Sequence, residues 1–235
     1  MKNSRSKGMG TMKTKMVALM AVVAMMASAA WAGDTSALHP PAGTRIALVV
    51  FEDLECPACA KADPLLMQAE RNYGLPLVRH DFVIPNHPWS KEAHIMARYF
   101  DTQSPQLGEE FRQYIFANQT SIYKTNLRDW ADKFAGAHHT ALPAFYDPTG
   151  ALRSKVEADT ELGRATGVHQ TPTIYVVSVA PGLPFLEVTE QGKLFETIEK
   201  VKAALPPAPK AAPAAKKATK KTAKKNVTKK ATAAA

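Results

Sequence analysis

The segment Cys56-Pro57-Ala58-Cys59 constrains this chain more than any other feature. Its two cysteines are the only ones in 235 residues, so a disulfide-rich scaffold is excluded. A disulfide between them closes a loop of about four residues, which stabilises a fold by roughly 2 kcal/mol on the loop-entropy model and joins no distant segments. The spacing therefore favours redox chemistry, with an inert structural disulfide as the alternative.

The flanking residues explain why thiol chemistry suits this position. The apolar run 46–51 predicts a strand buried on both faces, and residues 60–73 have helical spacing. Cys56 is therefore expected at a helix N-terminus, where free N–H groups and the helix dipole favour a thiolate. Pro57 then occupies the first helical position, which tolerates proline best. Cys59, one turn further in, is the more buried, resolving thiol.

Two other uses of a cysteine pair fit the sequence poorly. Metal binding needs two further ligands, and the candidates His80, His87 and His94 lack ligand spacing to the pair. Covalent haem attachment requires a histidine directly after the second cysteine, where Ala60 stands. We therefore expect no metal and no cofactor.

The hydrophobic periodicity predicts an α/β fold. Strands are expected at residues 45–53, 75–84, 173–177 and 185–188. Helices are expected at residues 60–73 (with a kink at Pro64), 90–101, 106–117, 126–134, 149–166 and 190–204. The predicted order is βαβ, a helical insert over about residues 86–166, and then ββα.

The two ends of the chain differ in charge from its middle. Of 30 basic residues, five lie in residues 1–32 and nine in residues 205–235, which leaves 16 against all 21 acidic residues. The middle thus has a net charge of −5, although the whole chain has +9. A mildly acidic folded part argues against specific nucleic-acid binding.

Both ends also have recognisable compositions. Residues 1–32 combine a basic start, an 11-residue apolar stretch and Ala30-Trp31-Ala32, which predicts a signal peptide cleaved after Ala32 and export to the periplasm. An uncleaved anchor is the alternative, but the apolar stretch is short for a membrane span. Residues 205–235 are rich in Pro, Ala and Lys, which predicts a disordered basic tail. The tail suits an anionic envelope polymer or lipid, or only keeps the protein soluble.

Two segments resemble a known family. Residues 51–59, Phe-Glu-Asp-Leu-Glu-Cys-Pro-Ala-Cys, resemble the active-site segment of the DsbA-type thiol–disulfide oxidoreductases. Residues 167–173, Gly-Val-His-Gln-Thr-Pro-Thr, resemble the second signature of that family. The resemblance covers about residues 43–204 and implies a thioredoxin-like fold over residues 33–204 with an inserted helical subdomain. It also implies a cis Thr171–Pro172 bond beside the cysteine pair, with the Thr171 backbone available to an extended substrate.

The chain departs from that family at two positions. Strongly oxidising members carry Pro-His between the cysteines, where this chain has Pro-Ala, and many carry a buried Glu at the position of Val50. Glu52 lies on the same strand face and is our candidate for proton transfer. The alternative is that Glu52, Asp53 and Glu55 are all solvated loop charges. Because a carboxylate near Cys56 raises the pKa of its thiol, we expect a less oxidising protein than the Pro-His members.

These observations predict an exported thiol–disulfide oxidoreductase that acts on protein cysteines in the oxidase direction. A separate redox partner is expected to return the cysteine pair to its starting redox state. Only about 12 residues lie between Ala32 and the first strand, so we expect a monomer without the dimerisation domain of isomerase members. An alternative of another class is a non-catalytic thioredoxin-fold binding module, tethered to an anionic envelope surface by the lysine-rich tail. Delivery of copper or reductant is a third possibility, which rests on the two thiols alone. Four aromatic residues of the insert are expected in the core, or lining a substrate groove near the cysteines: Trp89, Tyr99, Phe100 and Phe111.

Overall fold

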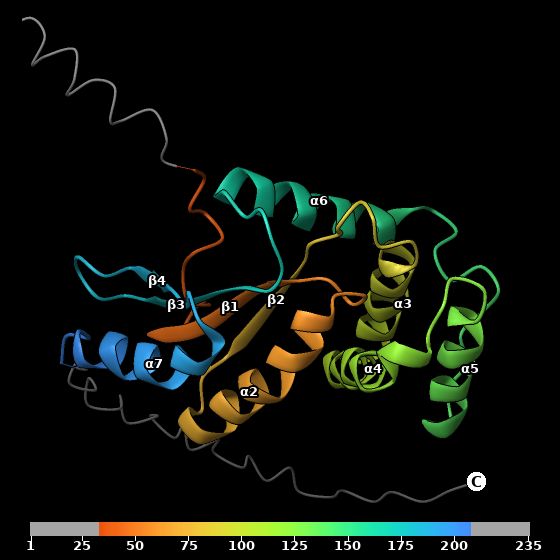
Figure 1. The fold of residues 1–235 in the computed structure, drawn as a ribbon, viewed down its shortest axis with the longest axis horizontal. Helices are drawn as coiled ribbons and strands as arrows, with labels where there is room; N and C mark the ends of the chain where they lie inside the picture. Colours follow the sequence, from red (N-terminus) through yellow and green to blue (C-terminus); the bar gives the residue numbers. More distant parts are fainter. Residues whose placement is uncertain (1–32, 208–235) are drawn as a thin grey trace, which may run out of the picture.

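The computed structural model of the chain describes residues 33–207 (Figure 1). The predicted signal peptide, and all but the first three residues of the predicted tail, lie outside the described residues. Within residues 33–207, no helix has both the length and the apolar character that crossing a membrane requires.

A four-stranded mixed sheet forms the centre of the fold. Its strands are β1 (Ile46–Glu52), β2 (Leu77–Asp81), β3 (Thr173–Ser178) and β4 (Phe185–Glu187), in the order β2-β1-β3-β4. β1 pairs in parallel with β2 and antiparallel with β3, which pairs antiparallel with β4. All seven residues of β1 are buried, as its continuous apolar sequence predicted.

Helices cover both faces of this sheet. Figure 1 shows α2 (Pro57–Tyr73) and α7 (Leu194–Ala203) on one face and α6 (Ala151–Thr166) on the other. α2 and α7 enclose an aliphatic core that includes Leu48, Val50 and Ile198. On the opposite face α6 packs closely, because a Cβ at Gly163 would lie only 2.4 Å from Cδ2 of Phe82.

The helical insert lies between β2 and β3. It comprises α3 (Ser90–Gln103), α4 (Pro105–Asn118), a 3-10 turn η1 (Gln119–Ser121), α5 (Leu127–Ala137) and α6. Phe100, Phe111 and Phe134 form its centre, with ring centroids 4.7 to 5.1 Å apart. The same buried cluster contains Cys56 and Cys59, so the insert packs directly against the cysteine pair.

The elements match the sequence predictions in type and order, with shifts at the ends that local chemistry explains. α2 begins at Pro57, three residues earlier than residues 60–73, because proline fits the first turn. β2 is shorter than residues 75–84, since Pro76 has no N–H for pairing and the Ile84 N–H bonds to the Asp53 carboxylate instead. α6 begins two residues late because Gly150, at φ 71°, precedes it in a turn.

Candidate active site

Cys56 occupies the N-cap position of α2. Its backbone is extended (φ −81°, ψ 118°), and its carbonyl accepts hydrogen bonds from the N–H groups of Cys59 (3.0 Å) and Ala60 (3.2 Å). Pro57 follows at the first position of the helix. The Cys56 sulfur therefore lies where the free N–H groups and the positive end of the helix dipole stabilise negative charge.

The Thr171 loop lies against Cys56, as the resemblance implied. In its thiol form Cys56 donates to the Thr171 carbonyl, with Sγ and O 3.3 Å apart. The Thr171–Pro172 peptide bond is cis. Residues separated by more than a hundred positions in the chain thus meet at one sulfur atom, because β1 and β3 are neighbours in the sheet.

The two thiols have opposite acidities. The pKa of Cys56 is lowered to about 5, first by a hydrogen bond with the Cys59 side chain and then by the Thr171 side chain and the backbone N–H groups of Cys59 and Ala58. Partial burial of Cys56 opposes this shift. At neutral pH the Cys56 sulfur is therefore a thiolate, the form that reacts with disulfides.

Cys59 remains protonated. Burial is the main cause that raises its pKa far above the usual range, and the negative charges of Cys56 and Glu52 add to it. Its Sγ accepts a long hydrogen bond from the Asp53 N–H (3.5 Å), and its side chain is 2% exposed. Cys56 is itself only 8% exposed, so the pair combines a thiolate that retains slight exposure with a more deeply buried protonated thiol, which suits disulfide exchange.

Glu52 is buried, which contradicts the alternative of a solvated charge. At the end of β1 it is 2% exposed, and its Oε2 accepts from Nη1 of Arg79 at 2.7 Å. Arg79 also binds Asp63 and Glu109, each at 2.7 Å. The other oxygen, Oε1, is buried and has no hydrogen-bond partner among residues 33–207. Burial raises the pKa of Glu52, and Arg79 opposes that shift.

Asp53 is likewise buried rather than solvated. Its carboxylate accepts from the N–H groups of Glu55 and Ile84, both at 2.7 Å, and lies 3.0 Å from Nδ1 of His87. A buried carboxylate is tolerated here because backbone donors replace the water that it loses.

Leu54 and Glu55 connect the cysteine loop to the insert. The Leu54 N–H donates to Nε2 of His94 (3.2 Å), whose Nδ1 lies 2.8 Å from Asp81. Glu55 is half-buried, and its Oε2 accepts from the N–H groups of Trp89 (2.8 Å) and Ser90 (3.0 Å). Glu55 thus satisfies free donors at the start of α3, and the expectation of a solvated loop charge is wrong for it as well.

The three histidines that were candidate metal ligands have carboxylate partners in the structure. His80 lies 3.1 Å from Asp159, and His94 lies 2.8 Å from Asp81. His87 Nδ1 lies 3.0 Å from Asp53 but forms no hydrogen bond within residues 33–207. No group of three or more metal-binding side chains occurs within the described part of the chain. Sequence reasoning missed Arg79 and the anchoring role of His94, because both act through partners that only the fold brings near.

Comparison with known proteins agrees with this geometry. A family model described as thioredoxin matches residues 40–178, so the chain belongs to the thioredoxin family. No curated protein sequence matches the chain significantly.

Solved structures show the same fold at low sequence identity. ScsC of Proteus mirabilis, in a transitional conformation, has a TM-score of 0.56 at 16% identity, over 83% of this chain and 92% of that one. Oxidised BdbD of Bacillus subtilis has a TM-score of 0.57 at 17% identity, over 72% and 94%. The thiol-disulfide exchange protein alpha-DsbA2 of Wolbachia pipientis has a TM-score of 0.54 at 13% identity, over 69% and 85%. The fold is therefore the thioredoxin fold with a helical insert, in its DsbA-like form.

Proposed function

We propose that this protein is an exported thiol–disulfide oxidoreductase that exchanges disulfides with protein cysteines through Cys56 and Cys59, in the oxidase direction. The observation that carries the proposal is the contrast between the two thiols, a thiolate at the start of α2 and a buried protonated thiol one turn later. Thiol–disulfide exchange proteins among its structural neighbours support the same class of reaction.

The oxidase reaction begins from a disulfide between Cys56 and Cys59. A client thiolate attacks Sγ of Cys56, the bond between the two cysteines breaks, and the Cys59 sulfur leaves and takes up a proton. The client's second thiolate then attacks the client sulfur of the mixed disulfide, and Cys56 leaves as a thiolate. The client gains one disulfide and the protein gains two electrons, which a redox partner must remove. The low pKa of Cys56 favours the last step, because a more acidic thiol is a better leaving group.

Glu52 is proposed to carry the proton that Cys59 gains and loses. Its charge is close enough to raise the pKa of Cys59, burial brings its own pKa up, and one of its oxygens is free of other hydrogen bonds within residues 33–207. A carboxyl group in this state can exchange a proton with Cys59, directly or through one water.

Thr171 and Pro172 are proposed to hold the client. The Thr171 carbonyl, which contacts Cys56 in the reduced form, is in position to pair with the backbone of an extended segment. Pairing of this kind selects the extended conformation and is indifferent to side chains, which suits an enzyme with many clients.

The reduction potential of the pair tests the direction of electron flow. A value between about −120 and −180 mV in glutathione buffers is expected for a protein that donates disulfides, whereas about −270 mV is typical of a reductant. A Cys56→Ser chain must lose exchange, and a variant that retained it would refute the mechanism.

We further propose that residues 1–32 direct export and are cleaved after Ala32, that residues 33–204 form a monomeric catalytic domain, and that residues 205–235 attach it to an anionic polymer or lipid of the envelope. Deletion of residues 206–235 tests this division, with exchange retained and surface attachment lost. If the protein exchanges no disulfides at all, the non-catalytic binding module becomes the better proposal.

A further inference from the structure

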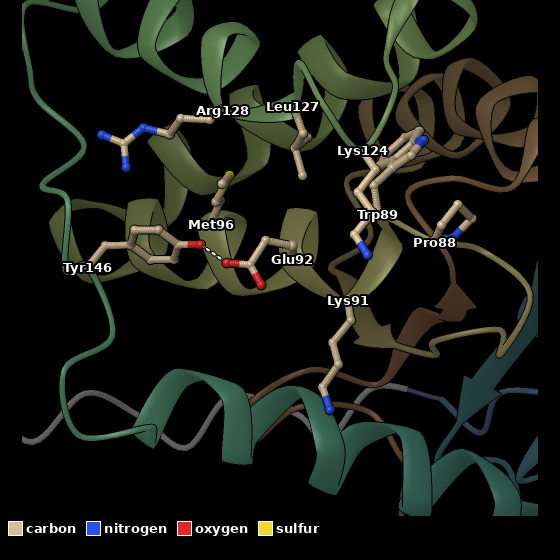
Figure 2. A pocket seen from close by; sticks show the side chains of 9 residues that line it. All are labelled: Pro88, Trp89, Lys91, Glu92, Met96, Lys124, Leu127, Arg128 and Tyr146. Carbon is tan, nitrogen blue, oxygen red and sulfur yellow. Dashed lines mark hydrogen bonds between the residues drawn. The ribbon is translucent and has the colours of Figure 1, made fainter.

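A pocket of about 510 Å³ lies in the helical insert, between α3 and the loops on either side of α5 (Figure 2). Its apolar lining includes Trp89, Met96, Leu127 and Tyr146, and its basic lining includes Lys124 and Arg128. The volume lies within the range of pockets that bind small ligands or inserted side chains. Neither the thiol chemistry nor the Thr171 loop uses this pocket.

The pocket and the cysteine pair share a wall. Trp89 lines the pocket and belongs to the buried cluster that contains Cys56 and Cys59. The backbone N–H of Trp89 donates to the Glu55 carboxylate, and Glu55 directly precedes Cys56. An occupant of the pocket therefore packs directly against side chains of the cluster that contains the reacting sulfurs.

The charge of the pocket is positive. Glu92 is the one acidic lining residue, and it accepts a hydrogen bond from the Tyr146 hydroxyl and lies 3.7 Å from Arg153. Lys91 and Arg128 also line the pocket and have acidic partners elsewhere, in Glu157 and Asp132 respectively. Lys124 forms no ion pair with any residue between 33 and 207. In Figure 2 its ammonium group lies beside Trp89, on the side of the pocket away from Tyr146.

Two exposed aromatic residues directly precede residues that line the pocket. Phe145 is 84% exposed and precedes Tyr146, and Tyr123 is 63% exposed and precedes Lys124. Together with Val179 they are the large apolar side chains that residues 33–207 expose most. Exposure of such side chains beside a pocket is typical of a surface that a partner covers.

We propose that this pocket, with Lys124, Tyr123 and Phe145 around it, is a docking site for acidic segments of the proteins that exchange disulfides with Cys56. The segment places an aromatic side chain between Trp89, Met96 and Leu127, and its carboxylates pair with Lys124. This inference rests on the proposed function and adds a preference among partners. The Thr171 backbone accepts any extended chain, whereas the pocket selects those with acidic and aromatic residues at a suitable distance from the cysteine.

Matched dithiol peptides test the preference. Each peptide carries either Glu-Trp-Glu or Lys-Trp-Lys, at several spacings from its cysteines. Its oxidation by the disulfide form of the protein is followed in a single turnover, so that no further oxidant is needed. We expect the acidic peptide to react about three- to tenfold faster than the basic one at its best spacing, because Lys124 is exposed and its pairing is screened by water. Lys124→Glu should remove most of this difference, and Phe145→Ser part of it.

Lys155→Glu is the matched control. Lys155 is exposed on α6 and does not line the pocket, and its substitution changes the net charge by the same amount. If it reduces the preference as much as Lys124→Glu does, the effect is one of net charge and the docking site is refuted. Equal rates for both peptides at every spacing refute it as well. Dithiothreitol is too small to reach the pocket while it reacts, so the rate of its oxidation should be unchanged in all variants. If the unmodified protein fails to oxidise dithiothreitol, the proposed function fails instead.

Binding without chemistry provides the second measurement. The double variant Cys56→Ser, Cys59→Ser should bind a labelled Glu-Trp-Glu peptide whose cysteines are replaced by serine. Addition of Lys124→Glu to this double variant should weaken the binding at least about fivefold. Retained affinity in the Lys124→Glu chain would place the peptide elsewhere and overturn the proposal.

Discussion

Replacement of Cys59 by alanine should raise the pKa of Cys56. The hydrogen bond from the Cys59 side chain is the largest of the causes that bring the Cys56 pKa down to about 5. A hydrogen bond to a charged group contributes about 1.5 to 3 kcal/mol, and one pKa unit corresponds to about 1.4 kcal/mol. Its loss is therefore expected to move the pKa of Cys56 from about 5 to between about 6 and 7.

The change is measurable as thiolate absorbance in the ultraviolet, titrated on the reduced protein. With a pKa of about 5, roughly 99% of Cys56 is thiolate at pH 7, and in the Cys59→Ala chain this fraction should fall to between about 50 and 90%. Alkylation of Cys56 as a function of pH should give the same midpoint, because the thiolate is the reacting form.

Two further variants separate the causes. Cys59→Ser keeps a donor at the same place and should raise the pKa less than alanine does. Thr171→Val removes the second side-chain hydrogen bond and leaves Cys59 intact, and about one unit of increase is expected. If the pKa of Cys56 in the Cys59→Ala chain lies within about 0.3 units of that in the unmodified protein, the Cys59 hydrogen bond does not set the acidity and this reasoning is wrong.

Four other outcomes are expected. The reduction potential should lie between about −120 and −180 mV, because a Cys56 pKa of about 5 is nearer to that of DsbA (about 3.5, −120 mV) than to that of thioredoxin (about 7, −270 mV). A value above −120 mV or near −270 mV would contradict this. Between about pH 5 and 8.5 the unfolded chain holds the Cys56 proton and the folded chain does not. The free energy of unfolding of the reduced protein, measured in urea, should therefore rise with pH relative to that of Cys56→Ala, and a constant difference would contradict this. Glu52→Gln should slow the steps that protonate or deprotonate Cys59 by at least about tenfold in stopped-flow exchange, with Cys56 alkylation unchanged as the control. His94→Ala should cost about 1 to 3 kcal/mol in urea unfolding, because it leaves the buried Leu54 N–H without an acceptor. A loss under about 0.5 kcal/mol would show that water replaces the ring.

The cysteine pair and the order of elements could be predicted from the sequence because both are local signals. A strand buried on both faces, a proline at the first helical position and helical periodicity depend on neighbouring residues alone. The Thr171–Pro172 contact came from the resemblance, since no spacing rule relates residues 115 positions apart.

The buried charges could not be predicted in this way. Glu52 is favourable inside the protein only because Arg79 comes from the adjacent strand, and that pairing depends on the register that sets Val50 opposite Arg79. His94 was considered as a metal ligand from the sequence, whereas the fold places it between Leu54 and Asp81. Three-dimensional neighbours decide whether a charge in an apolar context is solvated or compensated.

The three residues before Cys56 are all fixed to neighbouring elements, and this has a consequence for the choice of clients. Asp53 binds the segment after β2, Leu54 binds His94 in α3, and Glu55 binds the first residues of α3. A sulfur on so rigid a loop accepts attack along one line only, so the client must bend to reach it. Newly exported chains can do so, whereas a finished protein with its cysteines packed away must first open locally. In the proposed reaction, the anchors of the loop therefore favour flexible clients over folded ones, in addition to the sequence preference proposed for the pocket.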